Sequence, residues 1–406
     1  MKLLEKIKSY AKASNISSEK KEILALFLAN GFPTTKNEEW KYTSLKKIIA
    51  DDYSINTVGK TISNIDINKH SLGFKHKIIF VDGVLLTKPS IKNVSISDYS
   101  DFKPDGFDPI SGLNYSLAKN GYTISVSDNS IINTPIEILF FNTVEKNFMQ
   151  YRNILSIGKN SEATFVEKIQ NIDCNTSFIN NFTRINCEKN SKIEYSKVQN
   201  NTSSSRLIDS MNIYQKQDSV CSINTLIFGG EFIRNNLDFE QNGQNTESNM
   251  NGISVLNNSQ LADNHTFVDH KSANCRSNEM YKGVYLDSSR GVFNGKIMVR
   301  QDSQKIDAFQ ANNTLLLSEN ATINSKPQLE IYADDVKCSH GCTIGQLDES
   351  ALFYMRSRGI KIKEAQALLT YAFASEAINN INVEEVATLA KSLIAEKLNV
   401  NLDFSL

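Results

Sequence analysis

The sequence predicts a mainly β fold, in which a parallel β-helix lies between helical segments at the two ends of the chain. Short apolar alternations such as Tyr122–Val126 recur between residues 120 and 340, and this is the pattern of half-buried strands. A strand–turn unit also repeats, because alignment on Ser161, Ser191 and Ser219 gives spacings of 30 and 28 residues. Repeats of that period, with few helix signals between them, are typical of solenoids.

The composition indicates an ordinary globular protein. The chain has 406 residues, of which 40% are hydrophobic and 22% are charged, and its formal net charge is −1. A disordered chain carries fewer apolar residues, and a general nucleic-acid binder carries a basic excess. The sequence has no apolar run of about 18 residues, and Met1–Lys8 lacks the apolar core of a signal peptide. We therefore expect a cytoplasmic protein.

Residues 1–115 are expected to form an N-terminal helical and loop-rich region. Its beginning carries apolar side chains at helical spacing, with Ser17 as a helix N-cap and Gly31 as a stop signal. Residues 77–81 predict one strand, which is followed by an Asp82-Gly83 turn. The remainder is expected to be irregular because three prolines fall in it: Pro89, Pro104 and Pro109.

Residues 116–345 are expected to form the β-helix core. Proline is absent from 136 to 326, so nothing interrupts continuous strand ladders. A jelly roll or sandwich is the competing architecture, and it would need tight Asn-Gly hairpins between adjacent strands. Asn251-Gly252 and Asn294-Gly295 occur, but such pairs are too few to organise the whole region.

Residues 346–406 are expected to form a C-terminal helical domain. An acidic first turn at 348–350 begins a helix that Gly359 ends, and a second helix is predicted from Lys363 to Ile378. Asn382–Glu385 resembles a capping box before a third helix. Because about 60 residues are few for an independent core, we expect these helices to pack on the end of the solenoid or on a partner.

Reactive side chains cluster just before the helical domain. Cys338, His340 and Cys342 lie within five residues, and thiol and imidazole groups are ligands for soft metals. All three would share one face of a strand, because side chains alternate along it. A stable zinc site needs a fourth ligand, and no other Cys or His is near in sequence. A backbone-bonded histidine and a buried structural thiol are the alternative interpretations. The dispersed cysteines are expected to be buried: Cys174, Cys187, Cys221 and Cys275.

Other polar residues are expected to have structural roles rather than to bind metal. His265 and His270 are five residues apart, so a regular strand places them on opposite faces, where hydrogen bonds to neighbours are expected. Arg290, Asn294 and Lys296 are expected at corners and edges of the solenoid.

Motifs for nucleotide chemistry are missing. Nothing matches GxxxxGK[ST], so we expect no bound ATP, and any ATP hydrolysis must come from a partner. Without a Gly-rich dinucleotide fingerprint, flavin binding is left open. Asp334 and Asp335 could serve as acid and base in a glycan-cleaving β-helix, but adjacent strand residues point to opposite faces, which suits that chemistry poorly.

Several ordered motifs resemble the SufB/SufD family of iron–sulfur cluster assembly proteins. The motifs are Glu38–Thr43, Asp263–His270, Glu279–Val284, Ser289–Lys296, Gln304–Gln310, Pro327–Ile331, Cys338–Gly341 and Gly345–Ile360. Within the family, the Trp40 element, the Cys-Ser-His-Gly form at 338–341 and the length of the chain favour the SufD branch over SufB. Cys342 departs from the family, in which alanine is usual, and we interpret it as an incidental small residue.

The resemblance implies a right-handed parallel β-helix in a non-catalytic scaffold subunit of an ATPase-driven complex. It implies that the chain pairs with SufB through the β-helix and binds the SufC ATPase through its C-terminal helices. A nascent iron–sulfur cluster would form transiently at the SufB–SufD interface. His340, with Cys338 beside it, would be a tentative metal ligand that residues of SufB complete.

Two alternatives differ from this hypothesis. A SufB-like scaffold could act as a homodimer, in which a second copy of the chain replaces SufB. A polysaccharide-active β-helix enzyme is the less favoured alternative, since only the repeated strand pattern of the sequence suggests it.

Overall fold

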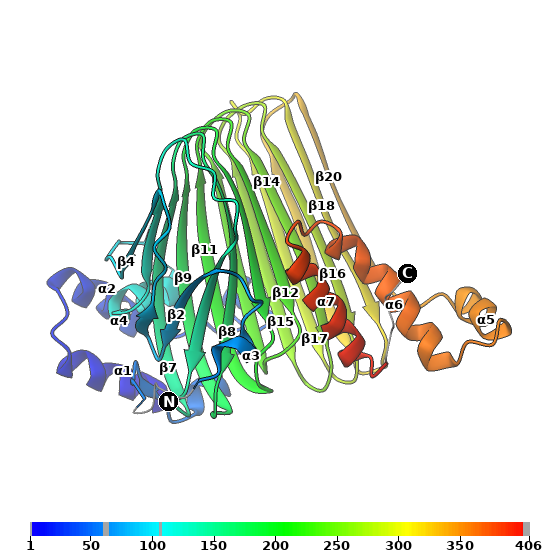
Figure 1. The fold of residues 1–406 in the computed structure, drawn as a ribbon, viewed down its shortest axis with the longest axis horizontal. Helices are drawn as coiled ribbons and strands as arrows, with labels where there is room; N and C mark the ends of the chain where they lie inside the picture. The colour runs from blue at the N-terminus through cyan, green and yellow to red at the C-terminus, as the bar shows by residue number, and fades with distance from the viewer. Residues whose placement is uncertain (1, 60–64, 105–107, 401–406) are drawn as a thin grey trace.

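The computed structural model describes residues 2–59, 65–104 and 108–400, and a solenoid of parallel strands forms its centre (Figure 1). From β5 (Tyr122–Val126) to β20 (Val336–Gly345), successive strands alternate between sheet A and sheet B, so hydrogen-bonded neighbours in each sheet are two strands apart along the chain. The pairings among β6 (Ile136–Asn142) to β20 are all parallel, which confirms the β-helix prediction, since a jelly roll would be antiparallel.

Each sheet contains ten strands within the described residues. Sheet A consists of β1 (Ser54–Ile55), β4 (Val94–Asp98), β5 (Tyr122–Val126), β7 (Asn147–Ile157), β9 (Thr176–Cys187), β11 (Ser204–Gln215), β13 (Phe232–Gln241), β15 (Leu261–His270), β17 (Arg290–Val299) and β19 (Thr322–Ile331). Sheet B consists of β2 (His76–Val81), β3 (Val84–Thr87), β6 (Ile136–Asn142), β8 (Glu162–Asn171), β10 (Lys192–Gln199), β12 (Val220–Ile227), β14 (Glu247–Leu256), β16 (Arg276–Tyr285), β18 (Ile306–Leu316) and β20 (Val336–Gly345). Antiparallel strand pairs occur only near the N-terminal end of the described solenoid, between β2 and β3 and between β4 and β5.

The repeated serines mark one corner of the solenoid. Ser161, Ser191 and Ser219 are buried and come immediately before β8, β10 and β12. Asn160 and Asn190 precede two of them with φ angles of 53° and 56°, a left-handed conformation that asparagine tolerates. Asn190 Nδ2 also donates to Asn160 Oδ1 at 2.9 Å. The repeat in the sequence is therefore the circumference of one coil.

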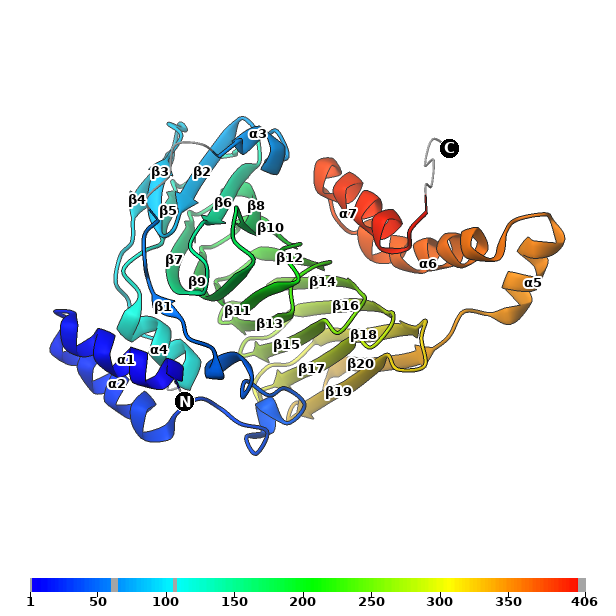
Figure 2. The ribbon, with the colours of Figure 1, turned by 90° about the horizontal axis from the view of Figure 1, so that it is seen from below.

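N-terminal helices cover the outer face of sheet A (Figure 2). Ser17 Oγ caps α2 by accepting from Lys20 N at 3.3 Å, and Gly31 ends the helix with φ 74°. Apolar residues of α1, α2 and α4 pack against outward-facing side chains such as Phe148 and Phe178. The helical elements are α1 (Lys2–Ala13), α2 (Ser18–Asn30), η1 (Glu38–Trp40), η2 (Ile48–Ala50), α3 (Ile67–His70) and α4 (Pro109–Leu117).

Helix α4 contradicts the expectation that the chain around Pro109 is irregular. Pro109 is instead the first residue of the helix, where its missing N–H costs nothing. Asp108 Oδ2 accepts from Ser111 N at 2.6 Å and caps the helix.

The C-terminal helices are α5 (Glu349–Ser357), α6 (Ile362–Ile378) and α7 (Glu384–Lys397). Helices α6 and α7 pack on the outer flank of sheet B rather than on the end of the solenoid (Figure 2). The predicted capping box does not form, because Val383 is the N-cap of α7 and makes no side-chain cap bond. Asn382 Nδ2 instead donates to Glu194 Oε2 at 2.7 Å and ties α7 to β10.

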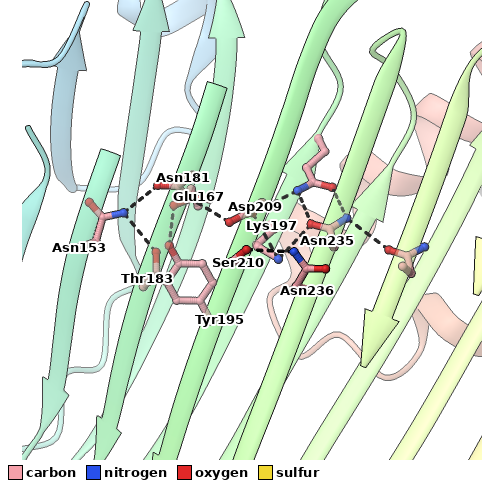
Figure 3. Close-up of polar contacts among 12 residues, drawn as sticks. Asn153, Glu167, Asn181, Thr183, Tyr195, Lys197, Asp209, Ser210, Asn235 and Asn236 are labelled. Atoms are coloured by element: carbon pink, nitrogen blue, oxygen red, sulfur yellow. Dashed lines mark hydrogen bonds and ion pairs between the residues drawn. The ribbon is translucent and has the colours of Figure 1, made fainter. Parts of the chain in front are cut away.

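The interior of the solenoid is apolar at most positions but contains a buried polar network (Figure 3). Lys197 Nζ lies 3.3 Å from Asp209 Oδ2, and the two side chains are 1% and 0% exposed. Lys197 also donates to Asn235 Oδ1 at 3.1 Å, and Asn181 Nδ2 donates to Asp209 Oδ1 at 3.2 Å. Because the ion pair links β10 of sheet B to β11 of sheet A, it fastens the two sheets across the core.

Among the residues that the structure describes, no helix combines the length and the apolarity that crossing a bilayer requires.

Candidate functional site

The predicted residues Cys338, His340 and Cys342 lie on β20, the last strand of sheet B. β20 pairs only with β18, so its outer edge meets no other strand among the described residues. The same holds for β19 in sheet A. The solenoid therefore ends in an open coil, from which the chain leaves toward α5 (Figure 2).

The strand register fixes the face on which the three side chains lie. Cys338, His340 and Cys342 stand opposite three buried residues of β18. The buried partners are Ala308, Gln310 and Asn312. On the other face of β18, Asp307 and Phe309 are exposed and Ala311 is buried. The prediction of one shared face is confirmed, and it is the face that lines the solenoid interior. Since no further coil covers β20, His340 and Cys342 are exposed and Cys338 is half-buried.

Cys338 packs against the apolar cluster that closes this end of the core, beside Leu329 and Val336. Burial, with a smaller contribution from the Asp307 carboxylate, raises the pKa of the Cys338 thiol. The thiolate is the form that binds metal. The proton of the Cys338 thiol is therefore harder to remove than that of a free thiol, and a cation bound by this sulfur would have to displace it.

A chain of buried polar side chains leads from the interior toward His340. Thr266 Oγ1 and Gln310 Nε2 both donate to Glu279 Oε2, at 2.6 and 3.0 Å. Gln310 lies opposite His340 in the strand register, and its Oε1 atom is buried without a hydrogen-bond partner among the described residues. Gln310 Oε1 can therefore accept from an N–H of the imidazole. Such a bond fixes the tautomer of a ligating histidine and leaves its other nitrogen free.

The open coil does not form a complete metal site by itself. Within the described residues, no group of three or more His, Cys, Asp or Glu side chains is placed to hold a metal ion. Cys342 is exposed, and its register partner Asn312 donates to Ser325 Oγ at 2.8 Å across the interior. Cys338 and His340 thus offer one thiol and one imidazole, and further ligands would have to come from another chain.

Exposed apolar side chains gather around the open coil and the adjoining helix. Four of them lie on or next to the last three strands: Phe309, Ile331, Tyr332 and Ile344. Helix α5 has no buried residue, and its Phe353 and Tyr354 are 71% and 59% exposed. Clustered apolar groups of this kind mark surfaces that bind other proteins.

A second cluster joins η1 to the outer face of sheet A. The Arg234 guanidinium lies 3.9 Å from the centroid of the buried Trp40 ring, and its Nη1 atom lies 2.7 Å from Asp263 Oδ2. Thr43 Oγ1 donates to the same oxygen at 2.6 Å. His265 Nε2 lies 2.8 Å from Asp263 Oδ1. Trp40 and Thr43 of the N-terminal segment therefore bind side chains of both β13 and β15.

In this second cluster, neighbouring charges favour the ionised carboxylate of Asp263 and the protonated imidazole of His265. Burial alone would raise the pKa of Asp263, but Arg234 and His265 outweigh it and hold that pKa well below its usual range. Burial would lower the pKa of His265, but Asp263 and Glu39 raise it above the ordinary value. The cluster is thus an ion network that fastens the N-terminal segment to the solenoid.

The structural role predicted for the two histidines is confirmed. His265 faces outward and His270 faces inward, where its Nε2 atom lies 3.0 Å from Ser277 Oγ. The corner position predicted for Asn294 and Lys296 is wrong, because both lie within β17. Asn294 Nδ2 donates to Glu39 Oε2 at 2.9 Å.

Sequence reasoning alone does not single out Gln310, Glu279 and Asp238 as residues of functional importance. Glu279 stands between the buried Met250 and Gln310, a signal that becomes visible only when the strands are aligned coil by coil. Asp238 stands between the half-buried Asn212 and Phe267 and carries no such signal. Asp334 and Asp335 lie in the turn before β20, where Asp335 O accepts from Lys305 N at 2.6 Å.

Family comparisons agree with the motifs. The family model "SUF system FeS cluster assembly, SufBD core domain" matches residues 140–373, which is more than half of the chain. The model "SufBD protein N-terminal region" matches residues 4–73. The first match spans most of the solenoid, the open coil and α5.

Curated relatives carry the same description. The iron–sulfur cluster assembly protein SufD of Escherichia coli is 30% identical over 96% of this chain and 94% of its own length. A SufBD family protein of Synechocystis is 27% identical over 86% of this chain and 84% of its own. SufD of Bacillus subtilis is 24% identical over 71% and 67%.

Proposed function

The chain belongs to the SufBD family of iron–sulfur cluster assembly proteins, and from this membership we propose that it is the SufD-type scaffold subunit of a SufB–SufC–SufD complex. It pairs with SufB through the open coil, and the nascent cluster is built as cargo between the two subunits. The observation that carries the proposal is that Cys338 and His340 stand on the inward face of a coil with no successor.

Pairing at the open coil has a physical basis. The free edges of β19 and β20 present unpaired backbone groups, which a second solenoid can satisfy by adding its own strands. The same contact would cover the exposed apolar side chains Phe309, Tyr332 and Ile344. It would also bring ligands of the partner to the incomplete set formed by Cys338 and His340.

His340 is predicted to serve cluster building rather than assembly. We expect His340→Ala to leave the ternary complex intact, because the side chain is exposed, and to lower cluster formation by about tenfold or more, since a neutral imidazole is a competent iron ligand. Anaerobic reconstitution of the purified complex with iron and sulfide, followed by absorbance and iron analysis, measures the change. Cys342→Ala, on the same strand, is the matched control and should behave like the wild type.

Two outcomes separate the parts of the proposal. Wild-type cluster formation by His340→Ala would move the site elsewhere on the subunit. Co-expression with SufB and SufC that yields only homodimers of this chain would show that a like subunit occupies the open coil, and it would contradict the heterodimer.

Helix α5 is the proposed contact for the SufC ATPase. Phe353 and Tyr354 of this helix are 71% and 59% exposed, and Tyr354 contacts Arg358 just beyond the helix, with the guanidinium 5.3 Å from its ring centroid. We expect the double substitution Phe353→Ala and Tyr354→Ala to weaken SufC binding by about tenfold or more, the size of effect that exposed aromatic anchors show at interfaces. Calorimetric titration with SufC measures this, with Leu86→Ala on the distant β3 as the control. Unchanged SufC affinity in the double variant would place the contact elsewhere.

A further inference from the structure

A cavity of about 370 Å³ lies between the N-terminal segment and the outer face of sheet A. Its walls include Trp40 of η1, Ser111 of α4, and Phe182 and Phe267 of the sheet. Cys338 and His340 do not line it, so it is separate from the open coil. The volume lies within the range of small-molecule sites.

Every cationic side chain that lines the cavity already has a carboxylate. Arg234 pairs with Asp263, and His265 lies 2.8 Å from Asp263 and 3.3 Å from Glu39. Lys296 Nζ lies 2.8 Å from Glu330 Oε1. The cavity therefore has no free positive charge with which to attract an anion.

Two carboxyl groups that line the cavity are influenced by cations only at longer range, Asp108 by Arg234 and Asp238 by His265. Neither Asp108 nor Asp238 has an ion-pair partner among the described residues. Asp108 accepts only from backbone N–H groups at the start of α4, including Ser111 N at 2.6 Å. The backbone of Asp238 is paired within sheet A, but its carboxyl group makes no hydrogen bond with any described residue. Burial, and then the neighbouring Asp108 carboxyl, raise the pKa of Asp238 to about 7.

Ser111 supplies an independent indication that a polar group is missing. Its side chain is 8% exposed, and its Oγ atom is buried without a hydrogen-bond partner among the described residues. Ser111 also lines the cavity. Unsatisfied buried hydroxyls are uncommon and costly, and a donor or acceptor of a ligand would satisfy this one.

We propose that this cavity binds a small organic diamine, with one ammonium group at Asp238 and the other at Asp108. Phe182 and Phe267 provide apolar aromatic walls for the carbon chain of the ligand, while Arg152 and Lys296 already lie over their rings, 4.3 and 5.8 Å from the centroids. A metal ion is disfavoured because the described residues hold no group of three or more ligating side chains. Since both η1 and sheet A line the cavity, the bound amine strengthens the attachment of the N-terminal segment to the solenoid.

Putrescine titration of the full-length protein tests the proposal. By calorimetry and thermal melting we expect saturable binding of putrescine, and no binding of the neutral analogue 1,4-butanediol. Asp238→Asn should weaken binding by about tenfold or more, as loss of a charge-assisted contact does. Asp302→Asn removes the same charge at an exposed turn outside the cavity and should leave the affinity unchanged.

Three results would overturn the site. They are the absence of saturable putrescine binding to the wild type, equal binding of 1,4-butanediol, and unaltered affinity in Asp238→Asn. Ser111→Ala provides a further test, since it should weaken binding while removing a buried unsatisfied hydroxyl. None of these measurements depends on cluster assembly, so the cavity and the open coil can fail separately.

Discussion

Replacing Lys197 with methionine is expected to lower the free energy of unfolding by about 3–5 kcal/mol, the usual cost of removing one partner from a buried ion pair. Lys197 and Asp209 are 1% and 0% exposed, and their charged atoms lie 3.3 Å apart. Methionine fills a similar volume but leaves the Asp209 carboxylate in the solenoid interior without a cation (Figure 3). Urea denaturation followed by circular dichroism measures the change.

The same strand provides a matched control. Lys192 begins β10 and pairs with Glu162 at 3.0 Å, but the two side chains are 60% and 47% exposed. Lys192→Met should therefore cost less than about 1 kcal/mol. The double variant Lys197→Met with Asp209→Asn should recover much of the loss, because it leaves no unpaired charge at this position. A Lys197→Met protein as stable as the wild type would show that the network does not hold the two sheets together.

Replacing Glu279 with glutamine is expected to stabilise the protein at alkaline pH and to have little effect at acidic pH. Burial raises the pKa of Glu279 from 4.5 to about 7. The folded state therefore holds a proton that the unfolded state releases, so stability falls as the pH rises from about 4.5 to about 7. Over that interval the loss amounts to about 3 kcal/mol, at 1.36 kcal/mol for each pKa unit. The amide oxygen of glutamine can still accept from Thr266 and Gln310.

Unfolding free energies at about pH 5 and about pH 8 test this second prediction. The difference between Glu279→Gln and the wild type should be small at the lower pH and should reach its full size at the higher pH. Glu319→Gln, which is exposed in the turn before β19, should show no such dependence. A stabilisation of equal size at both values would mean that the buried carboxyl is not the cause.

The β-helix could be predicted because serine residues recur at one corner of successive coils. Ser161, Ser191 and Ser219 each close the same turn, so the spacing between them reports the circumference of a coil. The buried state of the four dispersed cysteines followed from their strand-like surroundings. Side-chain alternation was also sufficient to place Cys338, His340 and Cys342 on one face.

Features that depend on contacts between distant segments could not be predicted. Pro109 signals a break as readily as a helix start, and only the packing of α4 on sheet A decides between the two. Asn382 has the form of a capping residue, but Glu194, 188 residues earlier, accepts its side-chain bond. In the sequence, Gln310 and Asp238 look like ordinary polar strand residues. Only the strand register shows which residues of the neighbouring coils lie beside each of them.

The open coil also has a consequence for how the molecule moves. In a stack of similar repeats, each inner repeat is held by two neighbours, whereas a terminal repeat is held by one. β19 and β20 form such a terminus among the described residues, with unpaired outer edges; most residues of β19 are half-buried and most of β20 are exposed. The last coil should accordingly exchange its amide hydrogens before the coils behind it. Docking of a second solenoid would supply the missing neighbour, so Cys338 and His340 would become rigid only when a partner has arrived.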